Sequence, residues 1–87
     1  MINARARTNE KEFNFGKLTV ALSESGNEQT WAHGLGGTPT KVEIVQANHN
    51  SSLTVCTSAE GTHTDTNVKF TPTMSGAGAD FIIIAQL

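Results

Sequence analysis

Short runs of alternating apolar and polar residues make up most of this chain, and clusters of Gly, Asn, Ser and Thr separate them. Alternation with a period of two is typical of a β-strand with one buried face, and no long stretch repeats with the period of an amphipathic helix. The pattern predicts an all-β fold, a small antiparallel β-sandwich or barrel of six to seven short strands. The expected strands span residues 13–22, 29–32, 40–47, 53–58, 66–71 and 79–87.

Two of these strands have irregular features. Phe13 and Phe15 share one parity, whereas the next apolar residue, Leu18, takes the other. Gly16 lies between them and predicts a bulge or turn at which the strand changes face. Pro72 is expected to end the fifth strand, because proline cannot donate a hydrogen bond to the ladder.

The last strand is apolar at both parities from residue 81 to residue 85. Such a run predicts a strand that is central in a sandwich or buried against another subunit. An exposed edge strand of this composition would aggregate.

The size of the chain favours association with other subunits. A domain of 87 residues buries roughly 60 to 65 per cent of its unfolded surface, so a lone monomer is marginally stable without a disulfide, a metal or subunit contacts. Cys56 is the only cysteine, which excludes an internal disulfide, and no Cys/His cluster has zinc spacing. Oligomerisation is the remaining means of stabilisation.

The chain divides into a polar N-terminal arm, residues 1–11, and a single β domain, residues 12–87. The formal net charge is -2, and Arg5 and Arg7 lie in the arm, so composition does not support a nucleic-acid partner. No apolar segment has the length to span a bilayer, and no signal segment is present, so we expect a soluble protein made in the cytoplasm without a membrane partner.

A glycine-rich corner separates the second and third expected strands, and it contains His33, Gly34, Gly36, Gly37 and Pro39. A phosphate-binding loop would lead into a helix, whereas a strand follows this corner. We therefore interpret the glycines as a structural chain reversal, and we expect the ring of His33 to bind nearby backbone groups.

The other residues that could bind a metal or act as a nucleophile are better explained by structural roles. His33, His49 and His63 lack the short spacing of a metal motif, although a trimer axis could gather one histidine from each subunit. Cys56 lies in a Thr-Val-Cys-Thr strand without a neighbouring base, so we interpret it as a small apolar residue.

Acidic and aromatic residues also give no catalytic pattern. Asp65 and Asp80 are far apart in sequence, and a chain of this length rarely builds a substrate cleft. Trp31, the only tryptophan, is interpreted as a core or interface anchor in preference to a sugar-stacking platform. The sequence thus predicts no enzyme, no catalytic residue, no metal site and no cofactor.

Residues 31–42, WAHGLGGTPTKV, combine His-Gly-Leu-Gly, two further residues, a proline and an alternating strand. This string resembles a pattern found in small β-rich structural proteins and fibre modules of tailed bacteriophages, and the apolar strand at 79–87 is similar in character to the ends of those modules. The resemblance implies a non-enzymatic virion component, commonly a homotrimer, that is either a capsid decoration (cement) protein or part of a fibre.

A compact chain with neither a shaft nor an attachment domain favours the decoration protein. The resemblance then implies synthesis in the host cytoplasm, a location on the capsid surface of the virion, and two partners, further copies of itself and the phage major capsid protein. The arm would contact the capsid through Ile2, Arg5 and Arg7. The last strand would build the subunit interface through Phe81, Ile82, Ile84 and Leu87.

The alternative from another class is a carbohydrate-binding module at the tip of a fibre or head fibre, for attachment to the host surface. It would bind glycan through Trp31, His49 and Asn50, with the loops at 48–52 and 59–65 around them. A third class is a small metal-dependent or hydrolytic enzyme.

Overall fold

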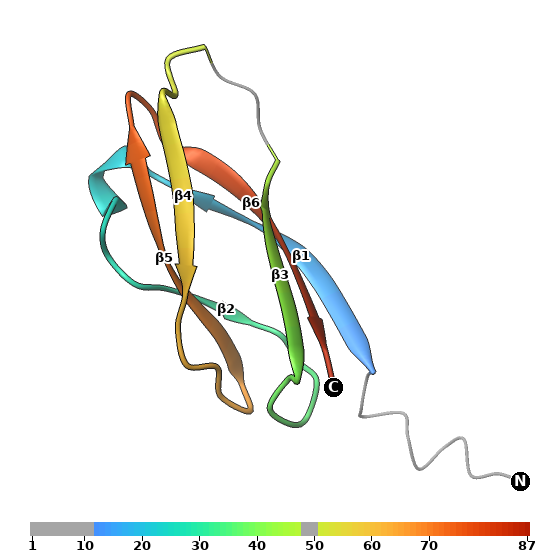
Figure 1. Ribbon diagram of the computed structural model, residues 1–87. Helices are drawn as coiled ribbons and strands as arrows, with labels where there is room; N and C mark the ends of the chain where they lie inside the picture. The colour runs from blue at the N-terminus through green and yellow to red at the C-terminus, as the bar shows by residue number, and fades with distance from the viewer. Residues whose placement is uncertain (1–11, 48–50) are drawn as a thin grey trace, which may run out of the picture.

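The computed structural model describes residues 12–47 and 51–87, and it is a β-sandwich of two three-stranded antiparallel sheets (Figure 1). A short 3-10 helix, η2 (Leu22–Glu24), follows the first strand. No helix in the described ranges is long and apolar enough to cross a membrane. The strands in these ranges are β1 (Phe13–Val20), β2 (Gln29–Ala32), β3 (Lys41–Gln46), β4 (Val55–Glu60), β5 (Asn67–Ser75) and β6 (Ala79–Gln86).

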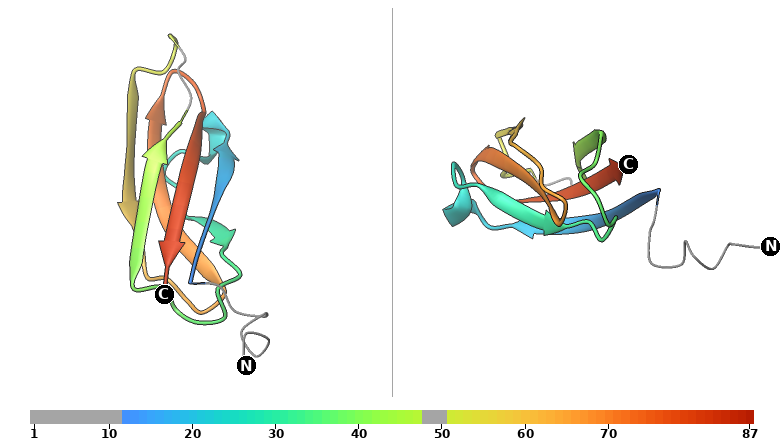
Figure 2. Two further views of the ribbon diagram at one scale, coloured as in Figure 1. Left: turned by 90° about the vertical axis from the view of Figure 1, so that its right-hand side faces the viewer. Right: turned by 90° about the horizontal axis from the view of Figure 1, so that it is seen from below.

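The predicted all-β fold is confirmed, and the two separate sheets make it a sandwich. Sheet A has the strand order β1-β6-β3, and sheet B has the order β2-β5-β4. Only β4 and β5 follow each other within one sheet, and every other connection crosses between the sheets (Figure 2). The last strand, β6, is central in sheet A, as one of the two expectations for it required.

The core lies between the inner faces of the two sheets. Phe70 of β5 and Phe81 of β6 meet edge to face with their ring centroids 5.3 Å apart. Such aromatic pairs add to the stabilisation that burial of the rings provides. The buried apolar residues are Val20, Leu35, Val68, Phe70, Met74, Ala79, Phe81, Ile83 and Ala85.

Strand β1 does not change face, so the prediction of a bulge or turn at Gly16 is wrong. Its register with β6 is continuous from Phe13 opposite Gln86 to Val20 opposite Ala79. Gly16 points inward, where a Cβ atom would lie 2.8 Å from the ring of Trp31. The glycine therefore makes room for the indole, and the outward parity carries Phe13 and Phe15 into solvent.

Strand β5 runs through Pro72, so the prediction that Pro72 ends it is also wrong. β2 pairs only with residues 67–70, and beyond them the Pro72 carbonyl accepts a hydrogen bond of 2.8 Å from the N–H of Gly26. The N–H and C=O of one residue lie on the same side of a strand. The position where Pro72 lacks an N–H therefore faces Gly26 and not β4, so the ladder between β5 and β4 loses no hydrogen bond. Ser25 Oγ completes the edge, because it accepts a bond of 2.8 Å from the N–H of Met74.

Candidate functional site

His33 holds the glycine corner to a neighbouring loop. The side chain is fully buried. Nδ1 accepts a hydrogen bond of 3.1 Å from the N–H of Leu35, and Nε2 donates one of 2.9 Å to the carbonyl of Thr64. These bonds confirm the expectation that the ring ties the corner to nearby backbone groups.

The corner turns inward through its glycines. Gly34 and Gly36 have φ angles of 66° and 83°, in the left-handed region that favours glycine. Between them Leu35 enters the core and is 0% exposed, although the sequence pattern gave no expectation for it. Pro39 is buried as well, and a Cβ on Gly37 would lie 3.3 Å from the side chain of Leu87. The corner is thus a packed part of the sandwich end, which supports its structural interpretation.

Trp31 lies on the inner parity of β2, opposite the buried Val68, and its half-buried indole contacts the backbone at Gly16. This position fits the interpretation as a core anchor. His49 and Asn50, the other residues of the glycan alternative, lie outside the described residues. Ala47, which borders that gap, donates its N–H to the carbonyl of Asp80 at the start of β6, whereas Thr40 at the glycine corner bonds to Gln86 at the end of β6.

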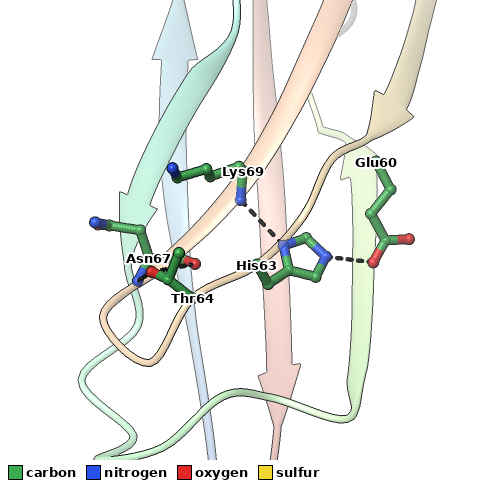
Figure 3. A network of polar contacts seen from close by, with 5 residues as sticks. All are labelled: Glu60, His63, Thr64, Asn67 and Lys69. Atoms are coloured by element: carbon green, nitrogen blue, oxygen red, sulfur yellow. Dashed lines mark hydrogen bonds and ion pairs between the residues drawn. The ribbon is translucent and has the colours of Figure 1, made fainter.

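The second described histidine also bonds through both ring nitrogens (Figure 3). His63 Nδ1 accepts a hydrogen bond of 3.1 Å from the N–H of Lys69, and Nε2 donates to Glu60 Oε2 at 2.5 Å. In the same loop, Thr64 Oγ1 accepts a bond of 3.0 Å from the N–H of Asn67. A metal or a proton-transfer role at His33 would have to break a hydrogen bond to the backbone, whereas Nε2 of His63 is held by the Glu60 carboxylate.

The other candidates for chemistry lie apart. Asp65 lies in the loop beside the glycine corner, whereas Asp80 lies at the start of β6, at the other end, where its carboxylate is 3.7 Å from Lys17 Nζ. Cys56 is half-buried against the core, and burial raises the pKa of its thiol, which disfavours the nucleophilic thiolate. No pocket was found among the described residues, nor was a group of three or more His, Cys, Asp and Glu side chains placed to hold a metal.

Exposed apolar side chains lie on the outer side of sheet A, among polar residues of the same parity, which are Lys17, Thr19, Lys41, Glu43, Asp80 and Gln86. The exposed fractions of Phe13, Phe15 and Val45 are 55%, 63% and 52%, and the two phenylalanine rings stack with centroids 6.3 Å apart. The register places Ile84 beside Phe15, and Ile82 beside Val45. We call these residues, Phe13, Phe15, Val45, Ile82 and Ile84, the apolar face.

The interface residues expected from the last strand divide among three places. Ile82 and Ile84 are half-buried on the apolar face. Phe81 is only 2% exposed in the core, so its assignment to a subunit interface is corrected: its ring lies between the two sheets. Leu87 is 41% exposed, but it packs beside Gly37 at the end of the sandwich, away from this face. The expected capsid contacts Ile2, Arg5 and Arg7 lie outside the described residues.

The sequence pattern contains a signal for the apolar face. Phe13 and Phe15 share a parity opposite to that of the buried Val20, and Val45 shares the parity of the charged residues Lys41 and Glu43. Extending the alternation without interruption would have placed all of these apolar side chains outside.

Comparisons with protein family models, with curated proteins and with solved structures gave no match to this chain.

Proposed function

We propose that the protein is a non-enzymatic structural component of a phage virion, a trimeric capsid decoration protein that binds the assembled head shell and stabilises it. The observation that carries the proposal is the apolar face. Large exposed apolar patches on a folded domain mark surfaces that associate with other molecules. The resemblance of residues 31–42 to phage structural modules supplies the setting.

The hydrogen bonds of the two described histidines favour a role in association over a role in catalysis. His33 binds backbone groups through both ring nitrogens, and His63 binds the Lys69 N–H through one and the Glu60 carboxylate through the other. These bonds hold the end of the sandwich that contains the glycine corner, so the domain presents its outer face on a firmly connected framework. A rigid surface loses less conformational entropy on binding than a mobile one.

Stabilisation of the shell would follow from mass action. A protein that binds the assembled lattice and not the free subunits shifts the equilibrium toward the lattice. A trimer that contacts three shell subunits also gains from multivalency, because after the first contact the others form at a high effective concentration. Neither effect requires a reaction at the protein.

Binding to shells tests the proposal directly. Purified protein at micromolar concentration should co-sediment with expanded shells that lack it, should saturate at a fixed ratio to the shell protein, and should raise the temperature at which the shells disrupt. Absence of binding to expanded shells would contradict the proposal.

The alternative, a glycan-binding fibre module, has less support because the indole of Trp31 packs on Gly16 inside the sandwich. A glycan array tests it separately. Binding that is lost in Trp31→Phe while the fold is retained would favour the fibre module over the decoration protein.

A further inference from the structure

We infer that the N-terminal arm, residues 1–11, adds as a further strand to the open edge of β3 in a neighbouring copy of this chain, antiparallel to β3 and with Arg7 opposite Glu43. The inference goes beyond the proposed function, because it depends neither on the shell nor on the number of copies. It also gives the arm a different partner from the capsid contact that the sequence resemblance implied.

The first argument is the alternation of residues within the arm. Small apolar and polar residues take turns: Ile2, Ala4 and Ala6 share one parity, and Asn3, Arg5 and Arg7 share the other. A period of two suits a strand with one covered side and one side in water. A sheet edge that receives such a strand needs an apolar inner side, and acidic residues on its outer side would pair with the arginines.

The second argument is that β3 has backbone groups directed at an open edge. Beyond the last pair of the register, Gln46 with Phe81, the N–H of Ala47 binds the carbonyl of Asp80. Bonded and non-bonded pairs alternate along an antiparallel ladder, so the odd-numbered residues of β3 bond to β6. The N–H and C=O groups of residues 42 and 44 therefore point to the other side, where sheet A ends. An added strand would form about four main-chain hydrogen bonds with them.

The third argument is that the side chains of β3 match both parities of the arm. Val42 and Ile44 are only partly buried on the inner side, where they pack against the core. Glu43 is exposed on the outer side, and no described residue forms an ion pair with it. The outward residues of the other edge strands, β1, β2 and β4, include no acidic side chain. Among the described edges, β3 thus fits small apolar residues inside and arginine outside.

The charges on β3 select the register. With Arg7 opposite Glu43, the uncharged Asn9 lies opposite Lys41. A shift by two residues brings Arg5 to Glu43 but sets Arg7 against Lys41, and like charges directly opposite each other are destabilising. The charge-matched register is therefore the one with Arg7 at Glu43.

This register requires a neighbouring copy. The carbonyl of Glu12 accepts a hydrogen bond from the N–H of Leu87, which fixes residue 12 on the β1 side of sheet A. A strand outside β3 lies three strand spacings from β1, or about 14 Å. The three residues from Asn9 to Glu12 span at most about 11 Å. The arm therefore reaches this position only on the β3 edge of another copy.

Disulfide formation between two variants of the full chain tests the pairing. Both carry Cys56→Ser, so that the introduced cysteine is the only one, and Arg5→Cys is mixed with affinity-tagged Val45→Cys in a glutathione redox buffer. The proposed register sets these positions opposite each other in a pair without hydrogen bonds, where side chains come closest. Ala6→Cys is the matched control, because the next residue of the arm points to the other side of the strand.

The tagged chain should capture Arg5→Cys several times faster than Ala6→Cys. Equal capture of the two arm variants, or capture of neither, would overturn the inference. A double variant, Arg5→Cys with Val45→Cys, that forms its disulfide only within one chain would also overturn it, because the arm would then lie on its own β3.

A charge exchange in the same assay tests the pair of Arg7 and Glu43. Arg7→Glu in one chain and Glu43→Arg in the other should each slow the capture by about threefold, and the two together should restore it. Glu28→Arg, which reverses an exposed charge next to β2, should not restore the rate in place of Glu43→Arg. Additive slowing by Arg7→Glu and Glu43→Arg would overturn the register.

These outcomes stay separate from the proposed function, because the assay contains no shells. Chains that pair through the arm but ignore shells contradict only the decoration role. Chains that bind shells but do not pair through the arm contradict only this inference.

Discussion

Both sheets consist of three antiparallel strands, but their outer faces carry different side chains. The outer side of sheet A carries Phe13 and Phe15 at 55% and 63% exposure. The corresponding side of sheet B is largely polar, with Thr57 opposite Thr73 on neighbouring strands and Thr71 beside them. Strand geometry is therefore satisfied equally by a largely polar outer surface and by one that exposes aromatic rings, and the choice of residue at the outward parity separates them.

The inner and outer aromatic residues of sheet A extend this comparison. Phe81 and Phe15 lie on adjacent strands of the same sheet but on opposite sides, and only Phe81 contacts sheet B. Burial of Phe81 stabilises the domain itself. Burial of Phe15 would stabilise the association of domains.

The largest expected loss of stability comes from a substitution on the inner side of sheet A. Phe81→Ala should lower the free energy of unfolding by about 3 to 5 kcal/mol, because it removes a buried ring and leaves a cavity. Urea denaturation at matched protein concentration measures the change. The control Phe15→Ala should cost much less in the isolated domain; equal losses for the two variants would show that the sides of sheet A are not distinct.

A second substitution tests the end of the sandwich that contains the glycine corner. His33→Ala should cost about 2 to 4 kcal/mol, because it leaves the Leu35 N–H and the Thr64 carbonyl without their side-chain partner in a buried setting. Thermal unfolding and amide exchange at Leu35 measure the loss. His63→Ala is the matched comparison and should cost less, since its side chain is 11% exposed and bonds an exposed carboxylate. A smaller loss at His33 than at His63 would contradict this interpretation of the corner.

The parity of β1 is tested at Gly16. Gly16→Ala should cost about 1 to 3 kcal/mol, because the new methyl group would overlap the Trp31 ring. Tryptophan fluorescence should change together with stability. Gly37→Ala, whose Cβ would meet only the tip of the flexible Leu87 at 3.3 Å, should be tolerated better. An unchanged Trp31 emission spectrum in Gly16→Ala would argue that the indole does not pack there.

The smallest effect concerns Cys56 on sheet B. Burial raises the pKa of the thiol, so the folded protein retains this proton to higher pH than the unfolded chain does. Any stability from this group is present below the ordinary pKa of a thiol and is lost as pH rises through the raised value. Labelling with iodoacetamide should be slower in the native protein than in urea at pH 8, and the difference should narrow as pH increases. Equal rates at pH 8 would contradict the effect of burial.

Local patterns in the sequence were sufficient for much of the fold. The strand predicted at 29–32 has the observed bounds, and the central place of the last strand follows from its apolar character at both parities. The role of the His33 ring was also predicted, because a histidine in a glycine-rich corner has backbone groups within reach.

The errors arose where a residue depends on a partner distant in sequence. Gly16 suggested a bulge because its contact with Trp31 cannot be read from neighbouring residues. Pro72 suggested a strand end because the departure of β2 from that edge of β5 is a property of the sheet. The inward or outward side of Phe81 could not be assigned within a wholly apolar run, since only pairing with β1 and β3 sets it.

The most direct measurement is hydroxyl-radical footprinting of the wild-type chain over a range of concentrations, read by mass spectrometry. If the outer side of sheet A is the surface that associates and that of sheet B is not, oxidation of Phe13 and Phe15 should be low at high concentration and rise on dilution, while oxidation at Val55 stays constant. Equal oxidation of the two phenylalanines at every concentration, in protein shown by scattering to be a trimer, would contradict the assignment of the apolar face as the surface that associates.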